Sequence, residues 1–146
     1  MNWKDNFPKD NRYFETENGI LYCGDCLEIM KEFPENSVDL VLTDPPYGVR
    51  KKEEWDNKNN FLNKVDKWIN ALFDKTKGVV IWFASDNMLP VIFKNNSNKF
   101  HRLLIWNKPK GSQYAGAVHS NIWYSLETIL IFAKNISVVS KHLLFC

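Results

Sequence analysis

The sequence contains no apolar run long enough to span a membrane, which takes about 20 consecutive apolar residues. Its first residues, Met1-Asn2-Trp3-Lys4-Asp5, lack the apolar stretch of a secretory signal peptide. Both absences predict a soluble, cytoplasmic protein with no membrane partner. The net charge is only +2 over 146 residues, so charge alone does not indicate nucleic-acid binding.

Cysteine and histidine are scarce, and their spacing argues against a metal site. Two of the three cysteines, Cys23 and Cys26, have the C-x-x-C spacing of zinc and redox sites. A zinc site needs a second pair of ligands, yet His101, His119 and His142 are scattered along the chain. We therefore predict no metal, and expect Cys23 to pack inside and Cys26 to lie at a strand–helix junction.

Glycine-rich phosphate loops are also absent. Gly111 and Gly116 lie in a polar loop over residues 107–121. They match neither the phosphate loop, which needs a Lys-Ser/Thr pair, nor the dinucleotide fingerprint, which needs three glycines. The sequence therefore gives no sign of either nucleotide-binding motif, and no internal repeat is visible.

The sequence does contain apolar segments that alternate with amphipathic ones. These segments predict strands over 19–23, 39–44, 79–84, 100–106 and 125–134, and helices over 27–33, 60–75 and 86–93. Strands that alternate with helices indicate an α/β fold with a parallel sheet. We expect residues 1–18 to form an irregular arm, residues 19–134 to form the folded part, and residues 135–146 to be a tail.

The most informative stretch is the strand that runs into Asp44-Pro45-Pro46-Tyr47. Proline has no N–H, so a central strand must end near Asp44. The residue before a proline is itself held in an extended conformation. The sequence thus predicts a stiff loop at the carboxyl end of a strand, where open α/β sheets bind their ligands.

The segment Asp44–Tyr47 resembles the catalytic motif of the amino-group DNA methyltransferases, which methylate adenine N6 or cytosine N4. The stretch from Tyr22 to Gly48 resembles those members that place the catalytic half before the methyl-donor loop. The resemblance implies a Rossmann-like sheet with an antiparallel strand pair at one edge, and residues 19–134 as the catalytic part. Aspartate in first position is more typical of the adenine enzymes, but cytosine-N4 methylation stays an alternative.

The resemblance also implies roles for the motif residues. The Asp44 carboxylate and the Pro45 carbonyl would accept hydrogen bonds from the target amine, while Tyr47 would stack on a base flipped out of double-stranded DNA. Asp25 and Cys26, together with Asp44, would contact the methyl donor S-adenosyl-L-methionine. Asp25 is equally interpreted as a helix N-cap, because an acidic residue, glutamate, follows three residues later as in a capping box.

Three basic residues, Arg50, Lys51 and Lys52, follow the motif at a place where a DNA phosphate would pass. Glu53 and Glu54 come directly after them, so a solvated charge run is the alternative interpretation. The resemblance implies double-stranded DNA as a partner and a restriction endonuclease in the same system.

One feature of the family, a donor loop of the form Phe-x-Gly-x-Gly, is missing from the sequence. We therefore interpret the chain as a catalytic half, whose partner is a missing C-terminal half or a second copy. This interpretation predicts an incomplete sheet in which the strand over 39–44 has one unpaired edge. A catalytically inactive, nucleic-acid-binding remnant is the alternative function.

Overall fold

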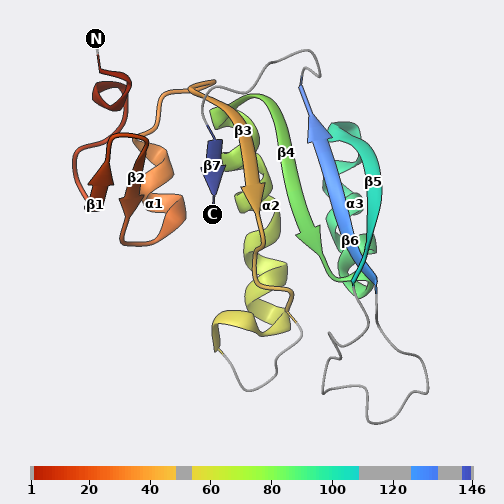
Figure 1. Cartoon of the computed structure of the whole chain (residues 1–146). Helices are drawn as coiled ribbons and strands as arrows, with labels where there is room; N and C mark the ends of the chain where they lie inside the picture. Colours follow the sequence, from red (N-terminus) through yellow and green to blue (C-terminus); the bar gives the residue numbers. More distant parts are fainter. Residues whose placement is uncertain (1, 49–53, 109–125, 135–142, 146) are drawn as a thin grey trace.

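The computed structural model describes residues 2–48, 54–108, 126–134 and 143–145, and its main feature is a mixed sheet (Figure 1). Its strands have the order β5-β6-β4-β3-β7. Their bounds are β3 (Val38–Thr43), β4 (Thr76–Ala84), β5 (Phe100–Asn107), β6 (Leu126–Ala133) and β7 (Leu143–Phe145). β3 is parallel to β4 and β7, whereas β6 is antiparallel to both β4 and β5. The predicted α/β class with an antiparallel pair at one edge is confirmed.

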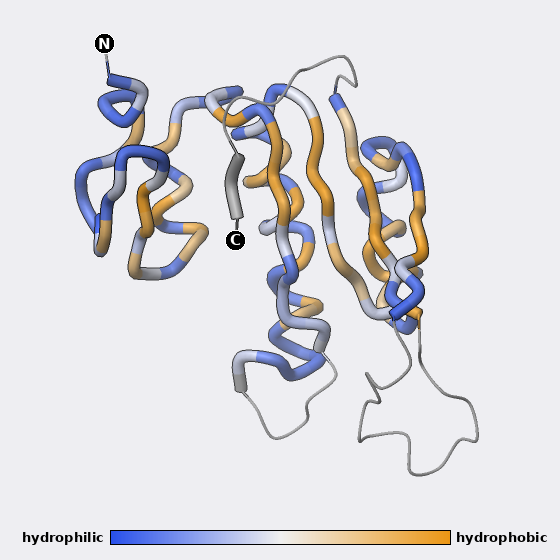
Figure 2. The backbone as a smooth tube through the Cα atoms, in the orientation of Figure 1, coloured by the Kyte–Doolittle hydropathy of each residue, from blue (hydrophilic) through white to orange (hydrophobic). Residues whose placement is uncertain are grey.

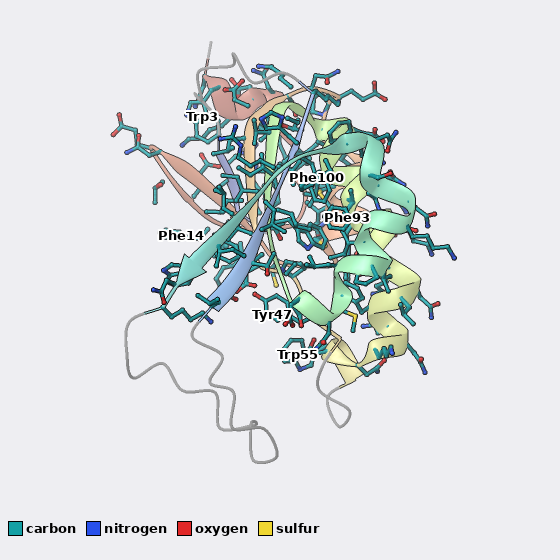
Figure 3. All side chains as sticks on the ribbon, turned by 90° about the vertical axis from the view of Figure 1, so that its right-hand side faces the viewer. Trp3, Phe14, Tyr47, Trp55, Phe93 and Phe100 are labelled. Carbon is teal, nitrogen blue, oxygen red and sulfur yellow. The ribbon has the colours of Figure 1, made fainter. Side chains whose placement is uncertain are left out.

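The described residues form three α-helices, of which α2 and α3 pack on one face of this sheet (Figure 3) while α1 packs against α2. They are α1 (Cys26–Lys31), α2 (Lys58–Lys75) and α3 (Leu89–Asn96), and short 3₁₀ turns cover η1 (Trp3–Asn6), η2 (Glu54–Asp56), η3 (Asp86–Met88) and η4 (Ser97–Lys99). α2 forms because its apolar residues recur at helical spacing, and these are the residues it buries: Phe61, Val65, Trp68, Ile69 and Leu72. The Asn57 side chain caps α2 by accepting from the Asn60 N–H at 2.8 Å.

The core lies between these helices and the sheet. Strand residues alternate between two faces, and on the helix-covered face Val80, Trp82, Leu130 and Phe132 are buried. The neighbouring positions on the opposite face, such as Ile81, are only half-buried. Figure 2 shows how apolar residues dominate β3, β4 and β6. Burial of the central strands fixes their ends, and thereby the loops that leave them.

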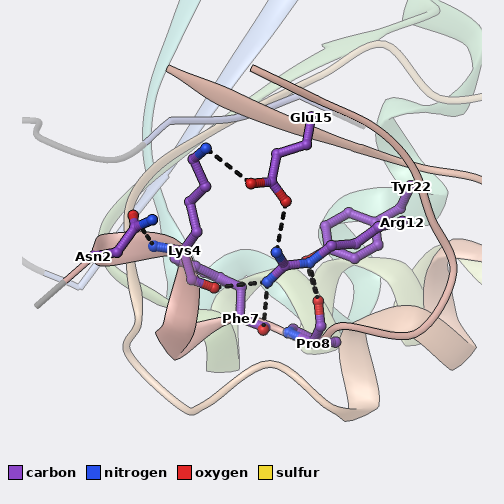
Figure 4. A network of polar contacts seen from close by, with 7 residues as sticks. All are labelled: Asn2, Lys4, Phe7, Pro8, Arg12, Glu15 and Tyr22. Carbon is purple, nitrogen blue, oxygen red and sulfur yellow. Dashed lines mark hydrogen bonds and ion pairs between the residues drawn. The ribbon is translucent and has the colours of Figure 1, made fainter. Parts of the chain in front are cut away.

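The described amino-terminal residues, 2–18, contain a 3₁₀ turn and a strand, so the prediction that residues 1–18 form an irregular arm is wrong. β1 (Arg12–Thr16) pairs antiparallel with β2 (Gly19–Tyr22) in a separate two-stranded sheet. The Arg12 guanidinium organises this region (Figure 4): it donates to the backbone carbonyls of Lys4, Phe7 and Pro8 at 2.7–3.0 Å. It also forms an ion pair with Glu15 at 2.7 Å. The predicted strand over 19–23 therefore exists as β2 but does not join the main sheet.

The position of β2 also explains a wrong prediction about cysteine. Cys23 was expected inside, but both Cys23 and Cys26 are exposed. The two-stranded sheet lies beside the main sheet and not within its core, so the residue that follows β2 stays in contact with solvent. Cys26 is the first residue of α1, at the predicted strand–helix junction.

The predicted unpaired edge on the catalytic strand is wrong as well. β7 pairs with β3 in parallel, with Leu40 opposite Leu143 and Leu42 opposite Phe145. Part of the predicted tail is thus a strand, whereas residues 135–142 and 146 lie outside the described residues. None of the helices in the described part of the chain is long and apolar enough to cross a membrane.

Candidate active site

The segment Asp44–Tyr47 leaves the carboxyl end of β3, whose last residue, Thr43, is buried and lies opposite Trp82 of β4. Asp44 is exposed, while Pro45, Pro46 and Tyr47 are half-buried. Figure 3 shows Tyr47 and Trp55 at the same end of the molecule, away from Trp3. The loop therefore presents a solvent-facing carboxylate next to a partly inserted aromatic ring.

Tyr47 is held by a residue 80 positions further along the chain. Its hydroxyl donates to Oε1 of Glu127 at 2.5 Å, which joins the loop after β3 to β6. Oε2 of the same glutamate accepts from Lys108 Nζ at 2.6 Å, and this lysine lies over the Trp106 ring. The sequence prediction missed Glu127. The feature that could have pointed to it is that Glu127 is the single charged residue in β6.

The protonation states in this contact follow from burial and hydrogen bonding. Burial, with hydrogen bonds and charge from Glu127 and Asp44, raises the pKa of Tyr47 far above its ordinary value. Burial also acts to raise the pKa of Glu127, but the hydrogen bonds from Lys108 and Tyr47 outweigh it and lower that pKa overall. At neutral pH a neutral phenol therefore donates to an ionised carboxylate.

The other end of the loop is tied to η2, the turn just before α2. The backbone N–H of Gly48 donates to Oδ1 of the buried Asp56 at 2.7 Å. Gly48 has φ of +70°, in the left-handed region that favours glycine. A Cβ at Gly48 would lie 2.8 Å from Cβ of Phe61, so the loop approaches α2 as closely as a glycine allows.

The predicted donor contacts lie at the same end of the molecule. Asp25 follows β2, and Figure 1 shows β2 and β3 pointing the same way, so Asp25 and Asp44 are both at strand ends on that side. Asp25 is the N-cap of α1: its Oδ1 accepts from the N–H of Leu27 at 2.8 Å and of Glu28 at 3.4 Å. The predicted cap is confirmed, and the donor contact of Asp25 and Cys26 stays a prediction.

The predicted DNA-contacting residues Arg50, Lys51 and Lys52 lie outside the described residues. Close to them in sequence is an open hollow of about 650 Å³ at the start of α2; its lining consists of Trp55, Asn57, Asn59, Asn60, Asn63 and Lys64. Trp55 is 55% exposed there. Within the described residues, no cluster of three or more His, Cys, Asp or Glu side chains is placed to hold a metal ion.

Residues 38–142 match the model of the N6/N4 DNA methylase family. The chain belongs to this family of amino-group DNA methyltransferases. The matched segment begins with β3 and includes both the Asp44–Tyr47 loop and Glu127. The sequence resemblance to this family is thereby confirmed.

Individual relatives support the same assignment. The Type II methyltransferase M.BamHI of Bacillus amyloliquefaciens is 43% identical over 63 residues, which cover 40% of this chain and 15% of that protein. The Type II methyltransferase M2.MboI of Moraxella bovis is 29% identical over 121 residues, with coverage of 66% and 44%. The chain therefore spans less than half the length of these relatives.

Solved structures show the fold. The PvuII DNA methyltransferase, described as cytosine-N4-specific, superposes with a TM-score of 0.68 at 20% identity, covering 94% of this chain and 60% of that one. The complex of M1.HpyAVI with S-adenosylmethionine gives a TM-score of 0.53 at 21% identity, with coverage of 78% and 54%. The sheet of this chain is thus that of the Rossmann-like DNA methyltransferases.

Proposed function

We propose that the chain carries the catalytic part of an S-adenosylmethionine-dependent DNA methyltransferase that acts on adenine N6. The observation that carries the proposal is the exposed Asp44 carboxylate on a stiff loop beyond β3, next to the half-buried Tyr47 ring. Aspartate as the first residue of the segment favours adenine. Cytosine N4 is the second candidate, because PvuII DNA methyltransferase is described as cytosine-N4-specific.

The chemistry depends on the electrons of the amine. The lone pair of an exocyclic amine is delocalised into the base ring, which makes the nitrogen a poor nucleophile. Two acceptors, the Asp44 carboxylate and the Pro45 carbonyl, draw the amine hydrogens into a geometry that frees the lone pair. Acceptors that are already in place need no rearrangement during the reaction. No proton has to be removed first, because the amine becomes acidic once it is methylated.

The target base has to leave the double helix, because its amine is otherwise paired. Tyr47 offers an aromatic ring at the reaction site, and stacking on such a ring is worth roughly 1–3 kcal/mol per base. A partly buried ring that is fixed at its hydroxyl end loses little freedom when the base arrives. Tyr47 therefore serves in this proposal as the platform that holds the flipped base beside Asp44.

S-adenosylmethionine supplies the electrophilic methyl group when it is bound. The exposed Asp25 carboxylate is held in one orientation by its two bonds to the α1 backbone, and it suits the hydroxyl and amine donors of an adenosine group. Cys26 follows it at the first position of α1. The structure of M1.HpyAVI with S-adenosylmethionine supports the choice of donor.

Double-stranded DNA is the proposed partner, approached through the start of α2. The amide-rich hollow beside the exposed Trp55 offers hydrogen-bond donors and a stacking surface, and Lys64 adds a positive charge. Arg50, Lys51 and Lys52 are proposed to contact the phosphates beside it. We further propose that the chain acts in the cytoplasm, with a cognate restriction endonuclease and a second segment or second copy as partners.

The test is methyl transfer by the 146-residue chain from tritiated S-adenosylmethionine to duplex DNA, followed by chromatography of the nucleosides. N6-methyladenine is the expected product. Asp44→Ala should lower the rate at least about a hundredfold, a barrier change near 2.7 kcal/mol. Asp86→Ala is the matched control, because Asp86 is an exposed carboxylate at the end of the neighbouring β4.

The control variant should stay within about threefold of the wild-type rate, as expected for a surface substitution. Labelled N4-methylcytosine in place of N6-methyladenine would show that the enzyme methylates cytosine N4, the second candidate. A wild-type chain that binds both DNA and S-adenosylmethionine and still transfers no label would be the inactive remnant.

A further inference from the structure

We propose that Glu127 is a positioning residue of this site: it accepts the single hydrogen bond that the Tyr47 hydroxyl can donate and thereby keeps that bond away from Asp44. The inference rests on the proposed function, because it concerns how Asp44 stays available to the target amine. It assigns a role to a residue that lies 83 positions after Asp44 in the sequence, on a different strand.

The contact has the geometry of a strong, charge-assisted hydrogen bond. A phenol has one proton to donate, and the distance of 2.5 Å from Tyr47 to Glu127 Oε1 is at the short end for a donor hydroxyl and a carboxylate. The Glu127 side chain is only 13% exposed, so little water competes for the bond. The hydroxyl proton therefore resides on the axis between Tyr47 and Glu127.

Glu127 is itself held in place from two directions. Its backbone belongs to β6, which has β5 on one side and β4 on the other, and Trp106 is its partner in β5. Its second carboxylate oxygen pairs with Lys108 at 2.6 Å, and the Lys108 ammonium lies 5.6 Å from the centre of the Trp106 ring. Both oxygens of Glu127 are thus engaged, which fixes the carboxylate as a permanent acceptor for Tyr47.

Asp44 is the competing acceptor. It lies three residues before Tyr47 in the same loop, and its charge, after burial and the bond to Glu127, helps to raise the pKa of the Tyr47 phenol. A phenol that donated to Asp44 would occupy one of the oxygens that the target amine needs and would disperse its negative charge. By accepting the hydrogen bond of the phenol, Glu127 leaves the exposed Asp44 available as an acceptor for the target amine.

A rescue experiment follows from this competition. Glu127→Met removes the acceptor and keeps the side-chain length, so Tyr47 turns to Asp44 and the methyl-transfer rate of the chain falls by about tenfold or more. Adding Tyr47→Phe to Glu127→Met removes the interfering proton, and the rate should recover to within about threefold of Tyr47→Phe alone. A purely structural role for Glu127 predicts the opposite, a double variant no better than the poorer single one, and that result would overturn the proposal.

A second measurement does not depend on activity. The coupling between Tyr47 and Asp44 is obtained from urea unfolding of Tyr47→Phe, Asp44→Ala and their combination, in the wild-type chain and again in Glu127→Met. We expect the coupling to be larger by a factor of about five or more in the unfolding equilibrium constant when Glu127 is replaced. Equal couplings in both backgrounds would show that Glu127 does not divert the proton.

Failure of the proposed function gives a different pattern. A chain that transfers no methyl group would remove the rescue experiment, but the unfolding cycle would still decide whether the proton is diverted. Circular dichroism of Glu127→Met confirms that the variant is folded; Glu127→Leu replaces it where it is not.

Discussion

Gly48 donates its backbone N–H to the buried carboxylate of Asp56 at 2.7 Å, and this bond ties the end of the loop to η2, the turn just before α2. The buried Thr43 fixes the beginning of the same loop at the end of β3. Asp44–Tyr47 is thus anchored at both ends by elements of the core. Such anchoring suits a site that depends on acceptors held in place before the substrate arrives.

The first prediction concerns the conformation of Gly48. Gly48→Ala should lower the free energy of unfolding by about 2–5 kcal/mol, because a left-handed residue with a Cβ costs about 1–2 kcal/mol and forced contact in a packed core adds about 1–3 kcal/mol. The new methyl would meet Phe61 at 2.8 Å, at a φ of +70°. Urea denaturation followed by circular dichroism gives the free energy.

Gly19→Ala is the matched control for this measurement. A Cβ at Gly19 would have an ordinary contact of 3.7 Å with the Thr16 hydroxyl. We expect its effect to stay within about 0.5 kcal/mol. Equal losses in the two variants would contradict the close approach of the loop to α2.

The second prediction separates two roles of Asp25. Asp25→Ala should lower the free energy of unfolding by about 0.5–2 kcal/mol, because the N–H groups of Leu27 and Glu28 lose their acceptor. Asp25→Asn keeps a good N-cap and should therefore keep the stability, while the lost charge weakens S-adenosylmethionine binding. Thermal melting and calorimetry check the two effects, and unchanged donor binding in Asp25→Asn would leave Asp25 as a cap alone.

Local sequence patterns were enough to predict the helices and strands whose buried residues recur at regular spacing. The helical spacing from Phe61 to Leu72 predicts α2, and the continuous apolar run after Gly78 predicts most of β4. The N-cap at Asp25 follows from residue type and spacing in the same way. In each case one segment contains both the signal and the structure that it produces.

The missed features depend on contacts between distant segments. β1 consists mostly of exposed residues, and its apolar residues do not alternate with polar ones. The segment before it is fixed by hydrogen bonds from Arg12 to backbone carbonyls, and no periodic pattern in the sequence predicts such bonds. β7 is only three residues long, and its partner strand, β3, lies about 100 positions earlier in the sequence. Glu127 reaches Tyr47 across 80 residues, so its role becomes visible only once β6 has been placed beside β4.

The third prediction tests the amino-terminal unit. Arg12→Lys should speed amide hydrogen exchange in β1 and β2, because an ammonium cannot bond the carbonyls of Lys4, Phe7 and Pro8 in the fork geometry of a guanidinium. Amides of the buried β4 should keep their protection, since the two sheets are separate. Lys9→Arg, at an exposed cation nearby, is the matched control because it also exchanges one cation for another, and equal exchange in both variants would contradict the role of Arg12.

The fourth prediction uses the raised pKa of Tyr47. An unfolded tyrosine has a pKa of about 10, and the folded state holds the Tyr47 proton to higher pH. The contribution of this group to stability is therefore complete below pH 10 and is lost as the pH rises above it. The unfolding free energy of the wild type should fall more steeply above pH 10 than that of Tyr47→Phe, by up to about 1.4 kcal/mol per pH unit.

Urea denaturation at a series of pH values from 8 to 11.5 measures the difference between the two proteins, in which the titration of all other groups cancels. Tyr13→Phe is the matched control, because the Tyr13 side chain is 75% exposed, and its curve should run parallel to that of the wild type. Below pH 9 the difference between wild type and Tyr47→Phe should be constant, since the phenol is neutral in both the folded and the unfolded chain. A difference that stays constant up to pH 11.5 would mean that the folded protein tolerates a phenolate beside Glu127. The hydroxyl proton would then not be held between the two residues.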